Sequence, residues 1–189
     1  MDAITLLKAD HKTVAGLFRK FDQLGERAHA SKRKLVDTII EELSVHAAVE
    51  EQLFYPFVQE YVDAEDMRLE SLEEHLAVKR LLADLEDLDP SHERFDAKVK
   101  VLQEMVKHHV DEEEHELFPQ VRATVGRIEL RELGDRIAEA KETAPTRPHP
   151  MLPDEPPLNA VTGAAAATFD RARDVGRDAL ERVRDRVGV

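Results

Sequence analysis

Two stretches of sequence decide how this chain folds: HAAVEEQLFYP at residues 46–56 and HVDEEEHELFP at residues 109–119. They align without a gap, so that the first histidine, the glutamate four residues later and the final proline each recur after 63 residues. The pair Asp10-His11 recurs as Glu74-His75 after 64 residues. The sequence therefore predicts two similar helical hairpins, each with an early histidine and a His-x-x-x-Glu-Glu…Pro unit.

Apolar side chains around these stretches recur every three or four residues, which is the spacing of one face of an α-helix. Four long helices are predicted, over about residues 2–24, 32–62, 64–88 and 91–126. Short connections between long helices favour antiparallel neighbours. The predicted fold is therefore all-α, an antiparallel up-down-up-down four-helix bundle with additional C-terminal helices. The proline that ends each repeated stretch is expected to kink its helix, because it removes a backbone donor.

Composition divides the chain into four predicted parts. Residues 1–126 form the bundle, and residues 127–142 form an additional helix. Residues 143–158 contain six prolines, too many for a helix, and are expected to be an extended linker. Residues 159–189 are expected to form an amphipathic helix that packs on the bundle or on a second subunit, the latter giving a homodimer.

The two additional helices have thin apolar faces. The first places three apolar residues at helical spacing, and the second carries a stripe of five. These residues are Ile128, Leu133 and Ile137 in the first, and Phe169, Ala172, Val175, Leu180 and Val183 in the second.

Charge and composition exclude several classes of partner. The chain carries 27 basic and 40 acidic residues, a formal net charge of −13, which disfavours nucleic acid and anionic membranes as partners. No run of 18 apolar residues is present to span a membrane, and the N-terminus does not resemble a secretory signal. With no cysteine there is neither a disulfide nor an iron–sulfur cluster. A cytoplasmic location is expected.

Ionisable residues interrupt the apolar faces of all four predicted helices. Each helix carries a histidine at a core-facing position whose neighbours on the same face are Leu, Ile, Val or Phe, and two helices add a glutamate one turn further on. The core-facing side of the second helix is expected to continue through Leu53 and Phe57. The ionisable core-facing residues are His11, His46, Glu50, His75, His109 and Glu113.

Bound metal explains so many ionisable groups in one core. An unpaired buried carboxylate costs several kcal/mol, whereas a whole domain is stable by only about 5–15 kcal/mol. A cation binds neutral imidazole and ionised carboxylate directly. His46 and Glu50, like His109 and Glu113, lie one turn apart on the same side of a helix, which suits two metal ions better than one. Nitrogen and oxygen ligands favour iron or manganese, with zinc as a further alternative.

These residues resemble the hemerythrin HHE cation-binding family, whose repeat is an early helix histidine followed by His-x-x-x-Glu on the next helix. The resemblance covers about residues 2–126. It implies an antiparallel bundle with a non-haem di-iron centre, two iron ions joined by an oxo or hydroxo bridge. It also implies that the four histidines are terminal ligands and that Glu50 and Glu113 are bridging carboxylates.

The sequence departs from oxygen-carrying hemerythrins at one ligand. Those proteins place a second histidine one turn from the ligand on the third helix, whereas the positions four residues from His75 are Ser71 and Lys79. One iron is therefore expected to keep an open or water-filled position, or to take a different side chain. Tyr55 is the best nearby phenol and is included among the candidate metal ligands, although simple helix geometry places it off the face of His46.

Several other polar residues lie close to these positions in the sequence. Glu51 and Glu114 are expected either to support the ligands or to be solvated. The five remaining histidines are expected at the surface, two because they fall off the face of His109 and three because they lie in or near loops. They are His108, His115, His29, His92 and His149.

Three functions fit such a centre. The first is disproportionation of hydrogen peroxide, a catalase-like activity favoured by the missing fifth histidine because an exchangeable position leaves room for turnover. The second is a module that binds or senses dioxygen or nitric oxide without turnover. The third is iron handling, for which two ions per chain offer little capacity. The sequence does not assign a catalytic side chain beyond the metal ligands.

Overall fold

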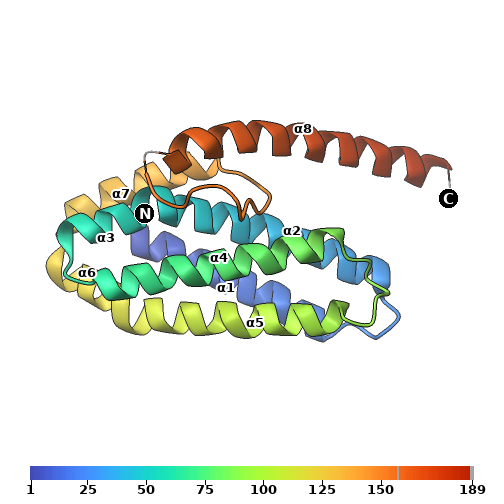
Figure 1. Ribbon diagram of the computed structural model, residues 1–189, viewed down its shortest axis with the longest axis horizontal. Helices are drawn as coiled ribbons and strands as arrows, with labels where there is room; N and C mark the ends of the chain where they lie inside the picture. The colour runs from blue at the N-terminus through green and yellow to red at the C-terminus, as the bar shows by residue number, and fades with distance from the viewer. Residues whose placement is uncertain (157, 188–189) are drawn as a thin grey trace.

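The computed structural model describes residues 1–156 and 158–187 and confirms the predicted all-α bundle (Figure 1). Four long helices, two of them extended by short ones, lie side by side, and two further helices pack outside them. No helix in the described ranges is long and apolar enough to cross a membrane. The bundle helices are α1 (Ala3–Asp22), α2 (His29–Val49), α4 (Glu65–Asp87) and α5 (Phe95–Glu112), and the extensions are α3 (Tyr55–Tyr61) and α6 (Phe118–Thr124).

The bundle has two apolar clusters, and the ionisable residues predicted from the sequence lie between them. Along α1, Leu7 belongs to one cluster and Val14 to the other, with His11 between them. Along α4, Leu72 and Val78 flank His75 in the same way. The helices are therefore held together by packed hydrocarbon on both sides of a polar layer.

Each repeated stretch contains a five-residue π-helical segment where a kink was expected. Segment η1 (Glu50–Phe54) joins α2 to α3, and η2 (Glu113–Leu117) joins α5 to α6. The amide of Tyr55 donates to the carbonyl of Glu50, five residues back. The proline that follows is the second residue of α3, where its missing N–H does not break a hydrogen bond.

The π segment corrects the predicted core register of the second helix. It contains one residue more per turn than an α-helix, so every later side chain is displaced by about 100° relative to an uninterrupted helix. Leu53 and Phe57 were expected to face inward, but both are only half-buried. Phe54 and Val58, one residue further on, are fully buried instead.

Helix α7 (Arg127–Lys141) packs against α1, α2 and η1. Leu133 and Ile137 are buried as expected, but Ile128 is 71% exposed and Leu130 takes the inward position. The reason is spacing, because Leu130, Leu133 and Ile137 are three and four residues apart whereas Ile128 lies five residues from Leu133.

The proline-rich segment and helix α8 (Leu158–Val187) lie along one side of the bundle (Figure 1). The segment forms no helix over residues 143–156, and Arg147 within it is buried. On α8, Ala167 and Asp170 are buried, whereas Phe169 and Val175 are 71% and 70% exposed. Ala172 is exposed as well. Packing of the predicted stripe on the bundle is therefore wrong for these three residues, and contact with a second subunit stays a prediction. The side chains of Leu180 and Val183 lie outside the described residues.

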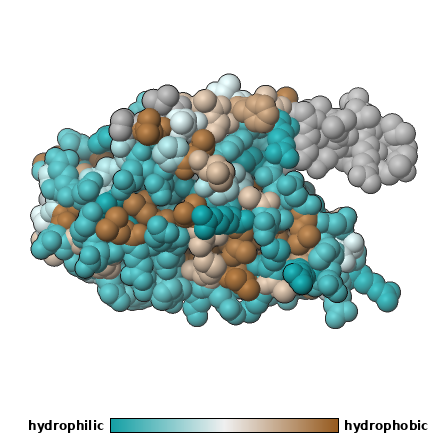
Figure 2. Space-filling model, in the orientation of Figure 1, coloured by the Kyte–Doolittle hydropathy of each residue, from teal (hydrophilic) through white to brown (hydrophobic). Residues whose placement is uncertain are grey.

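The visible surface is mostly hydrophilic, with hydrophobic residues in small patches (Figure 2). This agrees with the high content of charged residues, 35% of the chain. Scattered apolar residues are ordinary for a protein surface.

Candidate metal centre

Six predicted side chains converge in the polar layer of the bundle. They come from all four long helices and from both π segments, and none is more than 6% exposed. Their ligand-type atoms form two overlapping groups, each compact enough to surround a metal ion. One group is His11, His46, Glu50 and Glu113, and the other is Glu50, His75 and His109.

The four histidines form two pairs, one from each hairpin. The Nε2 atoms of His11 and His46 are 3.2 Å apart, and those of His75 and His109 are also 3.2 Å apart. Atoms that bind one metal ion at about 2.1 Å and at right angles are about 3 Å from each other. Each pair is therefore spaced as two ligands of one ion.

The two buried glutamates connect the histidine pairs. Oε2 of Glu50 lies 3.1 Å from Nε2 of His46 and 3.4 Å from Nε2 of His75. Oε2 of Glu113 lies 3.4 Å from Nε2 of His11 and 3.6 Å from Nε2 of His109. Each carboxylate thus contacts one imidazole of each pair, which is the arrangement that a bridge between two ions requires.

The carboxylates of the polar layer lack the hydrogen bonds that buried oxygens need. Among the described residues, both carboxylate oxygens of Glu50 and Oε2 of Glu113 are buried without a hydrogen-bond partner. Such groups cost about 1–3 kcal/mol each, and more when charged. Metal ions would satisfy all three oxygens, so the residues present fit a cation.

Four carboxylates, here called the outer carboxylates, hold the other nitrogen of each histidine. Each lies 2.7–3.3 Å from an Nδ1 atom. A neutral imidazole that donates from Nδ1 presents the lone pair of Nε2 to the centre of the bundle, as a metal ligand must. The pairs are Asp10 with His46, Glu114 with His11, Glu74 with His109 and Glu51 with His75.

Sequence reasoning missed the roles of Asp10 and Glu74. The signal was present, because both precede a repeated histidine, but a hydrogen bond to the next helix cannot be read from that position alone. The sequence allows Glu51 and Glu114 either to support the ligands or to be solvated, and in the structure both are hydrogen-bonded to imidazoles. The expectation that they are simply solvated is therefore wrong.

Tyr55 lies inside the polar layer, contrary to simple helix geometry. Its hydroxyl donates to Oε1 of Glu113 at 3.1 Å and lies 3.2 Å from Nε2 of His75. The cause is the π segment, because its extra residue turns Tyr55 by about 100°, toward the face that carries Glu50. The two positions one turn from His75 are engaged elsewhere, since Ser71 donates to a carbonyl of its own helix and Lys79 pairs with a carboxylate.

In the absence of a cation, the pKa values of the histidines in this layer shift in opposite directions. Burial lowers the pKa of His46, but the charge of Glu50 and a hydrogen bond to an outer carboxylate outweigh burial and raise the pKa to about 10. Burial and the charge of His109 keep the pKa of His75, on α4, well below its usual value. Two histidines of the same layer are thus driven to opposite protonation states.

The two glutamates behave in the same unequal way. Burial and the charge of Glu113 raise the pKa of Glu50. Burial also raises the pKa of Glu113, but His109 and His11 outweigh it and lower that pKa to about 2. Two cations would remove this asymmetry, because every histidine could then be neutral and both carboxylates ionised.

A small apolar cavity adjoins the four histidines. Its volume is about 30 Å³, measured as the space open to the centre of a water-sized molecule. Apart from the histidines, Asp10 and Ala47, its lining is branched hydrocarbon from all four long helices. The branched residues are Val14, Leu43, Val78, Val106 and Val110.

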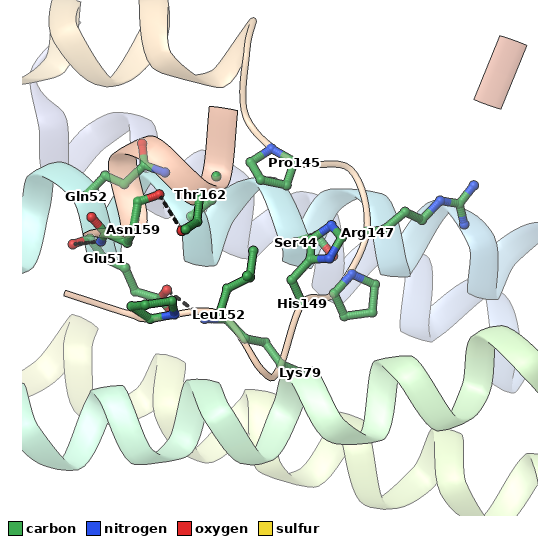
Figure 3. A pocket seen from close by; sticks show the side chains of 14 residues that line it. Ser44, Glu51, Gln52, Lys79, Pro145, Arg147, His149, Leu152, Asn159 and Thr162 are labelled. Atoms are coloured by element: carbon green, nitrogen blue, oxygen red, sulfur yellow. Dashed lines mark hydrogen bonds and ion pairs between the residues drawn. The ribbon is translucent and has the colours of Figure 1, made fainter. Parts of the chain in front are cut away.

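A second cavity lies on the outer side of Glu51, between α2, α4, the proline-rich segment and α8 (Figure 3). Lys79 donates to Oε2 of Glu51 at 2.6 Å, and the Asn159 side chain donates to the backbone carbonyl of Glu51 at 3.1 Å. The C-terminal part of the chain therefore covers the carboxylate that holds His75.

Most of the remaining histidines lie at the surface, as expected. His29, His92, His108 and His115 are exposed. His149 differs, because it is half-buried with Nε2 3.0 Å from a carboxylate oxygen of Asp170. The π segments, the paired histidines and the two glutamates between them thus remain the features that define the candidate centre.

Comparison with known proteins agrees with this geometry. The family model described as hemerythrin HHE cation binding domain matches residues 2–121. A hemerythrin-like protein of Schizosaccharomyces pombe is 29% identical over 136 residues, 71% of this chain and 67% of that protein. A DNA nickase of Nostoc is 27% identical over 141 residues, 75% of this chain but 39% of the nickase.

A solved structure is also similar. It is the crystal structure of a hemerythrin HHE cation binding domain-containing protein from Mycobacterium kansasii, an Rv2633c homologue. The TM-score is 0.66 at 26% sequence identity, and the match covers 75% of this chain and 86% of the other.

Proposed function

Because this chain belongs to the hemerythrin HHE cation-binding domain family, and thus binds metal ions, we propose that its six-residue cluster holds two iron ions and reacts with hydrogen peroxide. The observation that carries the proposal is the position of Glu50 and Glu113. Each carboxylate lies between imidazoles of both hairpins, and a single ion would not need two such connections.

Iron is the metal that supplies the change of oxidation state on which peroxide chemistry depends. The nitrogen and oxygen donors of the cluster suit it, and no thiolate competes. The protein's own contribution is to hold each Nε2 atom toward the centre through an outer carboxylate and to keep bulk water out.

Tyr55 is included in the proposed metal set. Its oxygen lies 3.1 and 3.2 Å from atoms of Glu113 and His75, the same range that separates the other candidate ligands. Burial and the charges of Glu113 and Glu50 raise the pKa of Tyr55 well above its usual value. Without metal, the phenol therefore keeps its proton and donates a hydrogen bond to Glu113. With metal, its oxygen would fill the position of the missing histidine.

The apolar cavity limits what can reach the centre. A water molecule needs roughly 10–15 Å³ when volume is measured in this way. A cavity of about 30 Å³ therefore admits a molecule of two or three non-hydrogen atoms and excludes organic substrates. Hydrogen peroxide meets that limit. The four histidines that line the cavity supply its contact with the centre.

Reversible binding of dioxygen or nitric oxide is the second candidate function. The observation that favours it is the lining of valines and a leucine, because an uncharged diatomic molecule loses little on leaving water for an apolar cavity. Peroxide, with two hydroxyl groups, would leave hydrogen bonds behind.

An oxygen electrode separates the two functions. We expect native protein with about two irons per chain to release one O₂ for every two H₂O₂ consumed, and His109→Ala to lose both iron and activity. Iron-loaded protein that releases no oxygen, but bleaches and recolours between anaerobic and aerated buffer, would favour gas binding. Natively isolated, folded protein without bound iron would refute both.

A further inference from the structure

Within the described ranges, three of the four outer carboxylates pair with a lysine, and the fourth does not. Each uses one oxygen to hold an imidazole, and three use the other oxygen to bind a lysine ammonium group. Those three oxygen–nitrogen distances are 2.5 Å for Asp10 with Lys141, 2.6 Å for Glu51 with Lys79 and 2.8 Å for Glu114 with Lys8. A positive charge therefore neutralises each of these carboxylates on its outer side.

Glu74 is the exception in the part of the chain that the structure describes. Its Oε2 atom holds Nδ1 of His109 at 2.7 Å, but its Oε1 atom faces Nε2 of His108 at 3.8 Å, and no lysine pairs with it. The same nitrogen of His108 lies 3.3 Å from Oε1 of Glu112. Where the other three sites have an ammonium group, this one has an imidazole and a second carboxylate.

We propose that Glu74, His108 and Glu112 bind a divalent transition-metal ion at the surface, separate from the buried centre. One nitrogen and two carboxylate oxygens lie within 4.8 Å of one another, and this donor set suits Zn²⁺, Mn²⁺ or Fe²⁺. Glu74 is fixed by His109, and the other two side chains are four residues apart on α5. His108 is 62% exposed, so it can close the remaining distance by turning.

The repeat explains why the site occurs on one hairpin only. Glu74 corresponds to Asp10, and His108 and Glu112 correspond to Val45 and Val49. In the first hairpin, α7 covers this face and supplies Lys141 to Asp10. Val49 is buried there in an apolar cluster, and Val45 is half-buried against the same cluster. In the second hairpin, the face is open to solvent at His108, so the cation has to come from solution.

The test is a zinc titration of the native protein, with iron measured in the same samples. After a wash with a chelator that leaves the buried iron, we expect wild type to bind one additional Zn²⁺ per chain. His108→Ala and Glu112→Gln should each weaken that binding at least tenfold and leave the iron content unchanged. His115→Ala is the matched control, because this exposed histidine bonds only to a carbonyl of its own helix, and it should bind zinc as wild type does.

Two results would overturn the site: wild type that binds no zinc beyond its iron, or His108→Ala and Glu112→Gln variants that bind zinc as tightly as wild type. The side chains of His108 and Glu112 are 62% and 35% exposed, and neither belongs to an apolar cluster, so we expect both variants to fold. The outcome is independent of the proposed function, because the zinc difference between wild type and His108→Ala can be measured whether or not the buried centre holds iron or consumes peroxide.

Discussion

Replacing Tyr55 by phenylalanine removes one buried hydroxyl group and leaves the ring in place. The ring is 1% exposed and packs against Phe54 and His75, so the substitution creates only the space of one oxygen atom. What is lost is the hydrogen bond to Oε1 of Glu113. Since Oε2 of the same carboxylate already lacks a hydrogen-bond partner, Glu113 is left almost unsolvated in the metal-free protein.

A hydrogen bond to a charged group contributes about 1.5–3 kcal/mol, and a buried partner left behind places the loss in the upper half of that range. We therefore expect metal-free Tyr55→Phe to be less stable than wild type by about 2–3 kcal/mol, which lowers the Tm by about 5–10 °C for a chain of this size. With iron bound, the cations satisfy Glu113 and the difference should be smaller.

Urea and thermal unfolding of chelator-treated protein, followed by circular dichroism, measure this loss. Tyr61→Phe is the matched control, because Tyr61 is 47% exposed and its hydroxyl is not buried in the polar layer. A loss below about 0.5 kcal/mol for Tyr55→Phe, the size of an ordinary surface substitution, would refute the reasoning. The visible spectrum tests a separate point: iron-loaded wild type should show a phenolate band that Tyr55→Phe lacks, and identical spectra would exclude Tyr55 as a ligand.

Three further predictions concern the scaffold and are tested by thermal unfolding. Gly134→Ala should destabilise by about 1–3 kcal/mol because the new Cβ would lie 2.2 Å from the carbonyl oxygen of Met1, whereas Gly25→Ala, with nothing within 4 Å, should show no such clash. Gly16→Ala should stabilise α1 by about 0.5–1 kcal/mol, since the nearest atom is 3.7 Å away. Asp2→Ala should cost about 1 kcal/mol at pH 7 through loss of the N-cap bond to the Thr5 amide. Burial raises the Asp2 pKa, but the hydrogen bonds from Thr5 outweigh it and lower the pKa below 3.8, so this contribution is present above that pH and disappears as the pH falls through the lowered pKa.

Much of this architecture was predictable because the repeat and the helical periodicity both indicate the direction in which each side chain points. His11, His46, His75 and His109 share faces with aliphatic residues, and a buried histidine on every helix of a bundle has few explanations besides metal. The positions of these candidate ligands along their helices follow from spacing alone.

The π segments were not predictable in the same way. The spacing of apolar residues does not distinguish a π turn from an α turn when two adjacent positions are both hydrophobic, because either one can face the core. Leu53 and Phe54 are adjacent, as are Phe57 and Val58, so either pair could supply the core residue. The proline two residues beyond each π segment is the one local signal, and it was interpreted as a kink.

Hydrogen bonds between helices also escaped prediction, and they change how the two hairpins depend on each other. Asp10 holds a histidine of its own hairpin, as Glu74 does. Glu51 and Glu114, by contrast, each hold a histidine of the opposite hairpin, and Glu50 and Glu113 beside them contact histidines of both hairpins. The residues that follow Glu50 and Glu113 therefore each orient a histidine across the bundle. It follows that neither hairpin can form half of the centre by itself, and that metal binding adds to the stability of the interface between the hairpins more than to either hairpin alone.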